Sequence, residues 1–123
     1  MMSTDAPINV EAVLGRTRVD LDLLIAMIAQ SIPHLQARCE SMYLAIDAGD
    51  TDQVARDAHA IKGSAGTLGM APLQALAVRL ERLSNGLVEG DLREGSASLQ
   101  AEMSRVTEHA VSLGAEVESV QGV

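Results

Sequence analysis

Apolar residues recur three and four positions apart along most of the chain, a spacing typical of amphipathic helices. No segment alternates apolar and polar residues at period two over a useful length. A short leading helix is predicted up to Gly15, and a longer stripe predicts one helix, or two stacked pieces, ending at Gly49. Pro33 should bend this helix, because it removes the hydrogen bond to the carbonyl of Ala29. The apolar positions of the two segments are Ile8, Val10, Val13 and Leu14, then Leu21, Leu24, Ile25, Ile28, Ile32, Leu35, Cys39, Met42 and Ile46.

Three more apolar stripes follow, each bounded by residues that begin or end helices. Asp50 or Thr51 can cap the first of these helices, and Gly69 should end it. Pro72 suits the first turn of the next helix, and Asp91 can cap the last one. The stripes are Val54, Ala58, Ile61, Ala65 and Leu68; Leu73, Leu76, Leu80, Leu83 and Leu87; and Leu92, Leu99, Met103, Val106, Ala110, Leu113, Val117 and Val120.

Short connections between long stripes predict an all-α fold, an antiparallel up-down four-helix bundle with a short N-terminal leading helix. At 123 residues the chain has room for one domain with one core. We expect a leading segment over residues 1–18, the bundle over residues 19–118 and a frayed tail over residues 119–123.

Composition excludes several classes of function. Hydrophobic residues make up 47% of the chain, but Phe and Trp are absent and Tyr43 is the only aromatic residue, so the core must be aliphatic. Nine basic and seventeen acidic residues give a net charge of −8, which argues against nucleic acid as the main partner. No apolar run approaches the roughly 18 residues of a membrane span, and the N-terminus does not resemble a signal peptide.

The cysteine and two of the histidine residues offer little chemistry of their own. Cys39 is the only cysteine, so it should be a small buried hydrophobe, and a single thiol suits the cytoplasm. His34 and His109 are interpreted as surface histidines, because neither belongs to the Glu-x-x-His pair of a di-iron bundle. We therefore expect no metal site and no bound cofactor.

The segment from residue 58 to 69, AHAIKGSAGTLG, breaks the local rules for a helix. Gly63 and Gly66 lie inside an apolar repeat, although glycine in a helix interior costs about 1 kcal/mol relative to alanine. His59 lies about 140° around the helix from the first residue of the apolar stripe, so it points away from the core. Ala55, Gly63 and Gly66 are its neighbours on the surface and would leave bare space around the ring.

An exposed imidazole beside a cation suits phosphoryl chemistry. Neutral histidine has one free nucleophilic nitrogen, and Lys62 brings an ammonium group within reach of anything attached to His59. A phosphoryl group carries about two negative charges, and its transfer needs mainly positioning and charge stabilisation. We therefore predict that His59 accepts a phosphoryl group from another protein. The chain has no Gly-rich loop of the kind that binds ATP.

The stretch His59-x-x-Lys62-Gly63-Ser64-Ala65-Gly66-x-Leu68-Gly69 closely resembles the signature of histidine-containing phosphotransfer (HPt) domains of multistep two-component relays. The resemblance runs from about Asp20 to Leu113 and includes the proline inside the long helix and the turn before the motif helix. It implies a phosphocarrier without kinase activity of its own. In such a carrier, His59 would shuttle a phosphoryl group between aspartates of receiver domains.

The resemblance also implies roles for single residues. Lys62 would stabilise the phosphoryl oxygens, and Glu81 on the next helix would orient His59. The partners would be response-regulator receiver domains and a hybrid sensor histidine kinase, with magnesium supplied by the receiver alone. No nucleic acid or membrane is expected as a partner, and the domain should be a monomer. The surface that binds the receiver would consist of Ala55, Gly63, Ser64 and Gly66.

Three alternatives fit the same residues. The phospho-accepting domain of a chemotaxis-type histidine kinase has a similar motif, and it takes its phosphoryl group from ATP bound to a separate kinase domain. A non-catalytic helical adaptor would use the cleared patch for binding alone. In the plainest alternative, His59 and Lys62 are two solvated polar residues, the glycines allow close helix packing, and Glu81 belongs to a solvated face.

Overall fold

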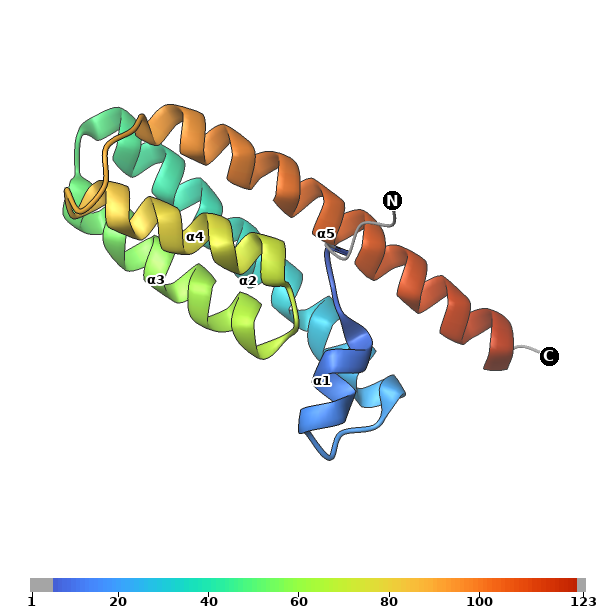
Figure 1. The fold of residues 1–123 in the computed structure, drawn as a ribbon. Helices are drawn as coiled ribbons and strands as arrows, with labels where there is room; N and C mark the ends of the chain where they lie inside the picture. The colour runs from blue at the N-terminus through green and yellow to red at the C-terminus, as the bar shows by residue number, and fades with distance from the viewer. Residues whose placement is uncertain (1–5, 122–123) are drawn as a thin grey trace, which may run out of the picture.

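The computed structural model describes residues 6–121, with side chains up to residue 114, and every regular element in this part is a helix. Figure 1 shows the long helices packed side by side, with the short helix α1 at one end. The predictions of an all-α fold and of a leading helix are confirmed. The helices are α1 (Val10–Arg16), α2 (Leu21–Ala48), α3 (Thr51–Thr67), α4 (Ala71–Ser84) and α5 (Leu92–Gln121).

The four long helices pack around one aliphatic core. Helix α2 packs on α3, α3 on α4, and α4 on α5, which returns to contact α2. The stripe predicted for α3 is buried along its whole length. The prediction that Leu87 belongs to the apolar stripe of α4 is wrong. Helix α4 ends at Ser84, and Leu87 lies in the following connection with 73% of its surface exposed. The core residues are Ile8, Val13, Leu24, Ile28, Leu35, Cys39, Met42, Ala45, Val54, Ala58, Ile61, Ala65, Leu68, Met70, Leu73, Ala77, Leu80, Leu83, Leu99, Met103 and Val106.

The helix ends follow from local chemistry. Asp50 caps α3, and its carboxylate accepts a hydrogen bond of 3.1 Å from the backbone N–H of Gln53. Asp91 accepts one from the backbone N–H of Arg93 at 2.9 Å. Gly69 follows α3 with φ of 74°, and a Cβ atom there would lie 2.8 Å from the carbonyl oxygen of Asn9. Only glycine fits both the left-handed backbone and the close approach.

Two predictions concern helix boundaries. Helix α2 is continuous through Pro33, so the alternative of one helix is correct, while the bend stays a prediction. Helix α5 is assigned up to Gln121, while the fraying of the tail stays a prediction, and residues 122–123 lie outside the described part. The side chains of Val117 and Val120 also lie outside it.

The N-terminal segment is fastened to the end of the bundle by backbone and side-chain contacts. The backbone N–H of Ile8 donates to His109 Nδ1 at 3.3 Å, and that of Asn9 donates to the Gly69 carbonyl at 2.8 Å. The Arg16 guanidinium donates to the carbonyl of Gly66 at 2.7 Å. His109 is therefore a half-buried acceptor and not a simple surface histidine, a contact between residues 101 positions apart that local patterns cannot reveal.

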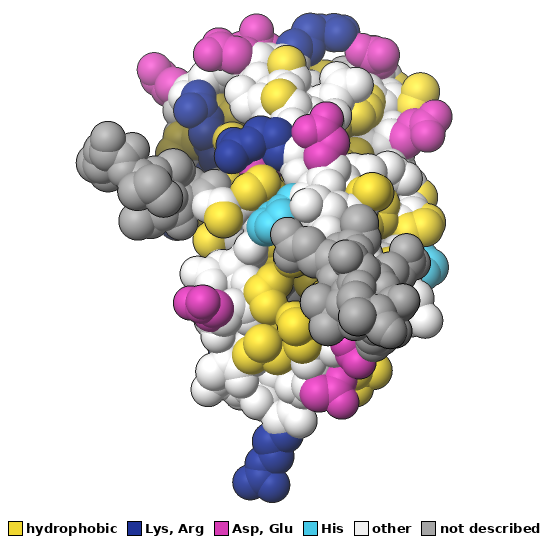
Figure 2. All heavy atoms as spheres, turned by 90° about the vertical axis from the view of Figure 1, so that its right-hand side faces the viewer, with side chains coloured by type: hydrophobic (Ala, Val, Ile, Leu, Met, Phe, Trp, Pro, Cys, Tyr) yellow, Lys and Arg dark blue, Asp and Glu magenta, His cyan; other side chains and the backbone are white. Residues whose placement is uncertain are grey.

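Charges of both signs are mixed on the surface. On the face in Figure 2, acidic and basic side chains gather together in the upper part of the view, and hydrophobic side chains reach the surface below them. Within residues 6–121, none of the helices combines the length and the apolar character that crossing a membrane would need.

Candidate functional site

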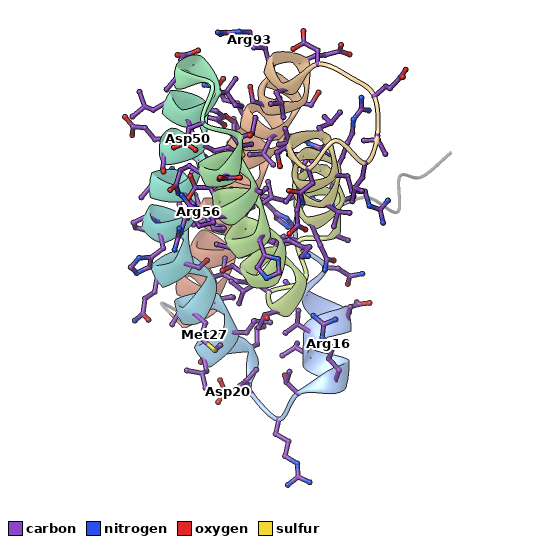
Figure 3. All side chains as sticks on the ribbon, turned by 90° about the vertical axis from the view of Figure 1, so that its left-hand side faces the viewer. Arg16, Asp20, Met27, Asp50, Arg56 and Arg93 are labelled. Carbon is purple, nitrogen blue, oxygen red and sulfur yellow. The ribbon has the colours of Figure 1, made fainter. Side chains whose placement is uncertain are left out.

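His59 lies on the outer face of α3, and 69% of its side chain is exposed. Its orientation follows from the apolar stripe of α3, because burial of Ala58 and Ile61 turns position 59 towards solvent. Figure 3 looks onto this side of the molecule, with α3 in front and α2 and α4 on either side. The prediction that His59 is exposed is confirmed.

The structure brings His59, Lys62 and Glu81 together around one carboxylate. Glu81 Oε2 lies 2.9 Å from His59 Nδ1, and Glu81 Oε1 accepts a hydrogen bond of 2.8 Å from Lys62 Nζ. Glu81 comes from α4, and its side chain is only 22% exposed. The three residues that the sequence pattern and the resemblance pointed to are therefore linked by hydrogen bonds across the α3–α4 interface.

The charge of Glu81 is stabilised by both of its partners. The Lys62 ammonium contributes most to holding the pKa of the Glu81 carboxyl below its ordinary value of 4.5, and His59 adds to this effect against the opposing effect of burial. An ionised carboxylate can only accept hydrogen bonds, so His59 Nδ1 carries the hydrogen. In a neutral ring the lone pair is then on Nε2, the nitrogen that is not held by Glu81.

The small residues around His59 do not all do what the pattern predicted. Gly63 is open, because a Cβ atom built on it would meet no described atom within 4 Å. A Cβ atom on Gly66 would lie 2.5 Å from Gln74 Nε2 of α4, so Gly66 allows close helix packing. Ser64 is exposed and Ala55 is half-buried. The bare space next to His59 therefore lies around Gly63 and Ser64.

This bare space continues into a groove between α2 and α3. The groove has a volume of about 670 Å³ and reaches from His59 to the half-exposed Met27 on α2. Figure 3 labels Met27 beside the C-terminal part of α3, with Arg16 of α1 across from it. The lining residues are Met27, Gln30, Ser31, His34, His59, Ala60, Gly63, Ser64, Thr67 and Leu68.

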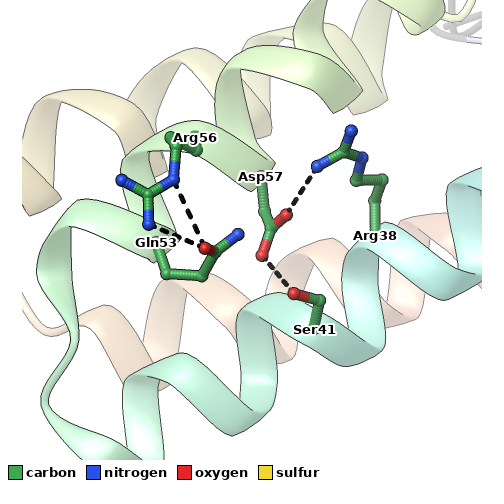
Figure 4. A network of polar contacts seen from close by, with 5 residues as sticks. All are labelled: Arg38, Ser41, Gln53, Arg56 and Asp57. Carbon is green, nitrogen blue, oxygen red and sulfur yellow. Dashed lines mark hydrogen bonds and ion pairs between the residues drawn. The ribbon is translucent and has the colours of Figure 1, made fainter.

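Sequence reasoning missed a buried polar cluster below the site. Asp57 is fully buried, and its carboxylate accepts hydrogen bonds from Ser41 Oγ at 2.7 Å and from Arg38 Nη1 at 3.1 Å (Figure 4). A signal was present, because position 57 falls on the apolar stripe between Val54 and Ile61. A charged residue on a buried stripe needs partners, and Arg38 and Ser41 share one face of the preceding helix.

Arg56 was also missed. It lies three residues before His59, and its guanidinium donates to Gln53 Oε1 at 2.8 Å and 3.3 Å (Figure 4). Together with Lys62 three residues after His59, it brings basic side chains to both sides of the histidine along α3. The His-x-x-Lys spacing drew attention to only one of the two.

Chemistry away from this site is limited. Cys39 is buried as expected, and desolvation raises the pKa of its thiol to about 11, although a hydrogen bond with Tyr43 acts in the opposite direction. Within the described residues, no group of three His, Cys, Asp or Glu side chains is arranged to hold a metal ion.

The fold and the site define a helical bundle that presents one exposed histidine on a helix, held by a carboxylate from the next helix. The chain matches the family model described as the Hpt domain over residues 25–120, and it therefore belongs to the Hpt domain family. Neither a curated protein nor a solved structure matches the chain. Domains of this family are phosphocarrier modules for histidine phosphotransfer in two-component systems, and they are not kinases.

Proposed function

We propose that this chain shuttles a phosphoryl group between aspartates of receiver domains through phospho-His59 in a two-component phosphorelay. The observation that carries the proposal is the bond from His59 Nδ1 to Glu81, because it leaves Nε2 of an exposed ring as the nucleophile. The carrier would present this ring on an antiparallel up-down four-helix bundle, act as a monomer in the cytoplasm, and need no cofactor of its own.

The reaction is a direct displacement at phosphorus. A receiver docks over Gly63 and Ser64, and its phospho-aspartate comes in line with His59 Nε2. The Nε2 lone pair forms the new N–P bond while the P–O bond breaks, and the electron pair leaves with the aspartate carboxylate. The ring becomes positively charged in this step, and the Glu81 carboxylate 2.9 Å from Nδ1 stabilises that charge. Transfer to the second receiver is the same step in reverse.

Lys62 has a second role in this scheme. In the resting protein its ammonium is held by Glu81 at 2.8 Å, within one turn of His59. Once the phosphoryl group is attached, its oxygens offer a stronger partner for the same ammonium. We propose that Lys62 then turns from Glu81 to these oxygens. Magnesium would be supplied by the receiver.

The direct test is the intact mass of the protein after incubation with phosphoramidate, for the wild type and for His59→Gln. The wild type should gain one phosphoryl group that acid removes, and His59→Gln should gain none. The variant should keep its melting temperature, because the ring is exposed and its only bond in the described structure is to Glu81. Phosphorylation that survives in His59→Gln would contradict the assignment of the acceptor.

A second measurement separates a carrier from an adaptor. Phosphorylated protein is mixed with a purified receiver domain, and the mass of both proteins is followed over time. A carrier should lose its phosphoryl group as the receiver gains one. An adaptor would bind the receiver without any such exchange. The phospho-accepting domain of a chemotaxis-type kinase would also pass its phosphoryl group to the receiver, but it would gain that group from ATP when an ATP-binding kinase domain is added.

A further inference from the structure

The cluster of Arg38, Ser41 and Asp57, here called the Asp57 cluster, has a cost that packing alone does not explain. Asp57 is fully buried in a small aliphatic bundle, while the Arg38 side chain is 52% exposed. Removing a carboxylate from water is unfavourable, and apolar residues of similar volume often stabilise a protein as well or better. What a carboxylate adds to an apolar side chain is direction, because its hydrogen bonds fix the positions of the donors.

Two carboxylates hold α3 from its two sides. Asp57 points from α3 towards α2, where Ser41 and Arg38 bind its two oxygens separately. Glu81 points from α4 towards α3, where it binds His59. Positions 57 and 59 lie about 200° apart around a helix, so they are on nearly opposite sides of α3. A rotation of α3 about its axis therefore moves both bonds at once.

The geometry allows very little rotation. Side chains reach about 5–6 Å from a helix axis, so a turn of about 10° moves their ends by about 1 Å. A hydrogen bond from nitrogen to oxygen is lost when it lengthens from about 2.9 Å to about 3.6 Å. A rotation of this size is thus enough to separate His59 Nδ1 from Glu81.

Apolar packing is less directional along part of α3 than along the rest. The buried side of α3 combines the larger Val54, Ile61 and Leu68 with Ala58 and Ala65. The alanines have no side chain beyond Cβ and form low ridges, so the packing around them is less sensitive to a small turn of the helix. The two bonds of Asp57 to α2 add direction next to Ala58.

We propose that the Asp57 cluster sets the rotation of α3 so that His59 Nδ1 meets Glu81, which makes Asp57 a positioning residue for the histidine. The geometric part of this inference is independent of the proposed function. Its consequence for phosphoryl transfer rests on that function.

The test compares Asp57→Ala, Asp57→Asn and Ser41→Ala with Val106→Ala as control. Val106 is fully buried on α5, which packs on α2 and α4, and it makes none of the hydrogen bonds of the cluster, so its variant should lose stability while keeping those bonds. The first readout is the ring ¹⁵N spectrum of His59 in mildly alkaline solution, assigned with His59→Gln, because it reports which nitrogen carries the hydrogen. The second is the rate of phosphorylation by phosphoramidate per folded molecule.

Asp57→Ala should shift the ring towards the form with hydrogen on Nε2 and should slow phosphorylation severalfold. Asp57→Asn retains an acceptor for Arg38, so its ring spectrum and its phosphorylation rate should lie between those of Asp57→Ala and the wild type. Val106→Ala should match the wild type in both readouts despite its lower melting temperature. If Asp57→Ala does not fold, Ser41→Ala removes one bond of the cluster and should show a smaller shift in the same direction.

Two results would overturn the inference. One is a wild-type ring spectrum in folded Asp57→Ala, or in Ser41→Ala where Asp57→Ala does not fold. The other is an equal shift in Val106→Ala, which would mean that any loss of stability disturbs the histidine. If the wild-type protein accepts no phosphoryl group, the proposed function fails, but the spectra still decide whether the Asp57 cluster positions His59.

Discussion

At the scale of single residues, Glu81 links the chemistry of the site to the stability of the fold. Its pKa is lowered, mainly by Lys62, so its charge stabilises the folded state above the ordinary pKa of 4.5. That contribution is lost as the pH falls through the lower pKa of the folded protein.

Glu81→Gln should therefore be less stable than the wild type near neutral pH, and the difference should shrink as the solution becomes acidic. Urea unfolding of both proteins over a series of pH values measures this directly. A difference in the free energy of unfolding that stays constant from neutral to acidic pH would show that the charge of Glu81 is not what stabilises the fold.

Gly63 is the residue at which stability and function should separate. A Cβ atom on Gly63 has open space, so Gly63→Leu should stabilise α3 by up to about 1 kcal/mol. The added side chain would stand where a receiver docks, so transfer from a receiver should fall at least tenfold. Phosphorylation by phosphoramidate should be unchanged, because a small donor needs no docking surface.

Gly114→Leu is the matched control for Gly63→Leu. Gly114 also has open space around its Cβ position, but it belongs to α5. This variant should transfer phosphoryl groups like the wild type. Equal transfer rates for Gly63→Leu and Gly114→Leu would remove the steric argument for Gly63.

At the scale of elements, the sequence predicted what depends on local spacing. The apolar stripe of α3, its cap Asp50 and its end at Gly69 were all correct, because each depends on residues within a few positions. The assignment of Leu87 to the helix was wrong, since spacing alone does not determine where a helix ends. The role of Gly66 was also misjudged, because its neighbour Gln74 comes from the next helix.

Helix α2 offers a test of how much a break in the backbone hydrogen bonds matters. Proline in a helix interior is about 3 kcal/mol less favourable than alanine, and part of this is offset because proline restricts the unfolded chain. Pro33→Ala should raise the free energy of unfolding by about 1–3 kcal/mol. Pro72→Ala is the control, because Pro72 lies in the first turn of α4, where its missing N–H has no partner to lose.

Urea unfolding measures both proline variants. The free energy of unfolding should rise clearly in Pro33→Ala and change little in Pro72→Ala. A loss of stability in Pro33→Ala would mean that the bundle depends on a bend of α2 at this position.

At the scale of the whole molecule, the contacts that escaped prediction are those between distant parts of the chain. His59 and Lys62 were found because their spacing on α3 resembles a known signature. Glu81 on α4 was found because the same resemblance implies a residue on the next helix that orients the histidine. The buried position of Asp57 signals that it needs partners, but which side chains of α2 supply them follows from three-dimensional packing, as does the contact between Ile8 and His109. Nothing in the local sequence fixes which helix faces meet.

Cys39 reports on that packing, because it is buried in the middle of α2. Burial raises the pKa of its thiol to about 11, so reactive thiolate is scarce in the folded protein at mildly alkaline pH. Labelling by iodoacetamide should therefore be very slow in the folded protein and fast in urea. Its rate should depend on the fraction of molecules that have opened.

The labelling rate, compared with the rate for unfolded protein, gives a free energy of opening around Cys39. If α2 leaves the core only when the whole bundle unfolds, this value should equal the free energy of unfolding from urea titration. Val106→Ala weakens the core on another helix and should lower both values equally. A labelling value well below the unfolding value would mean that α2 separates from the bundle by itself, and one core would then not behave as one cooperative unit.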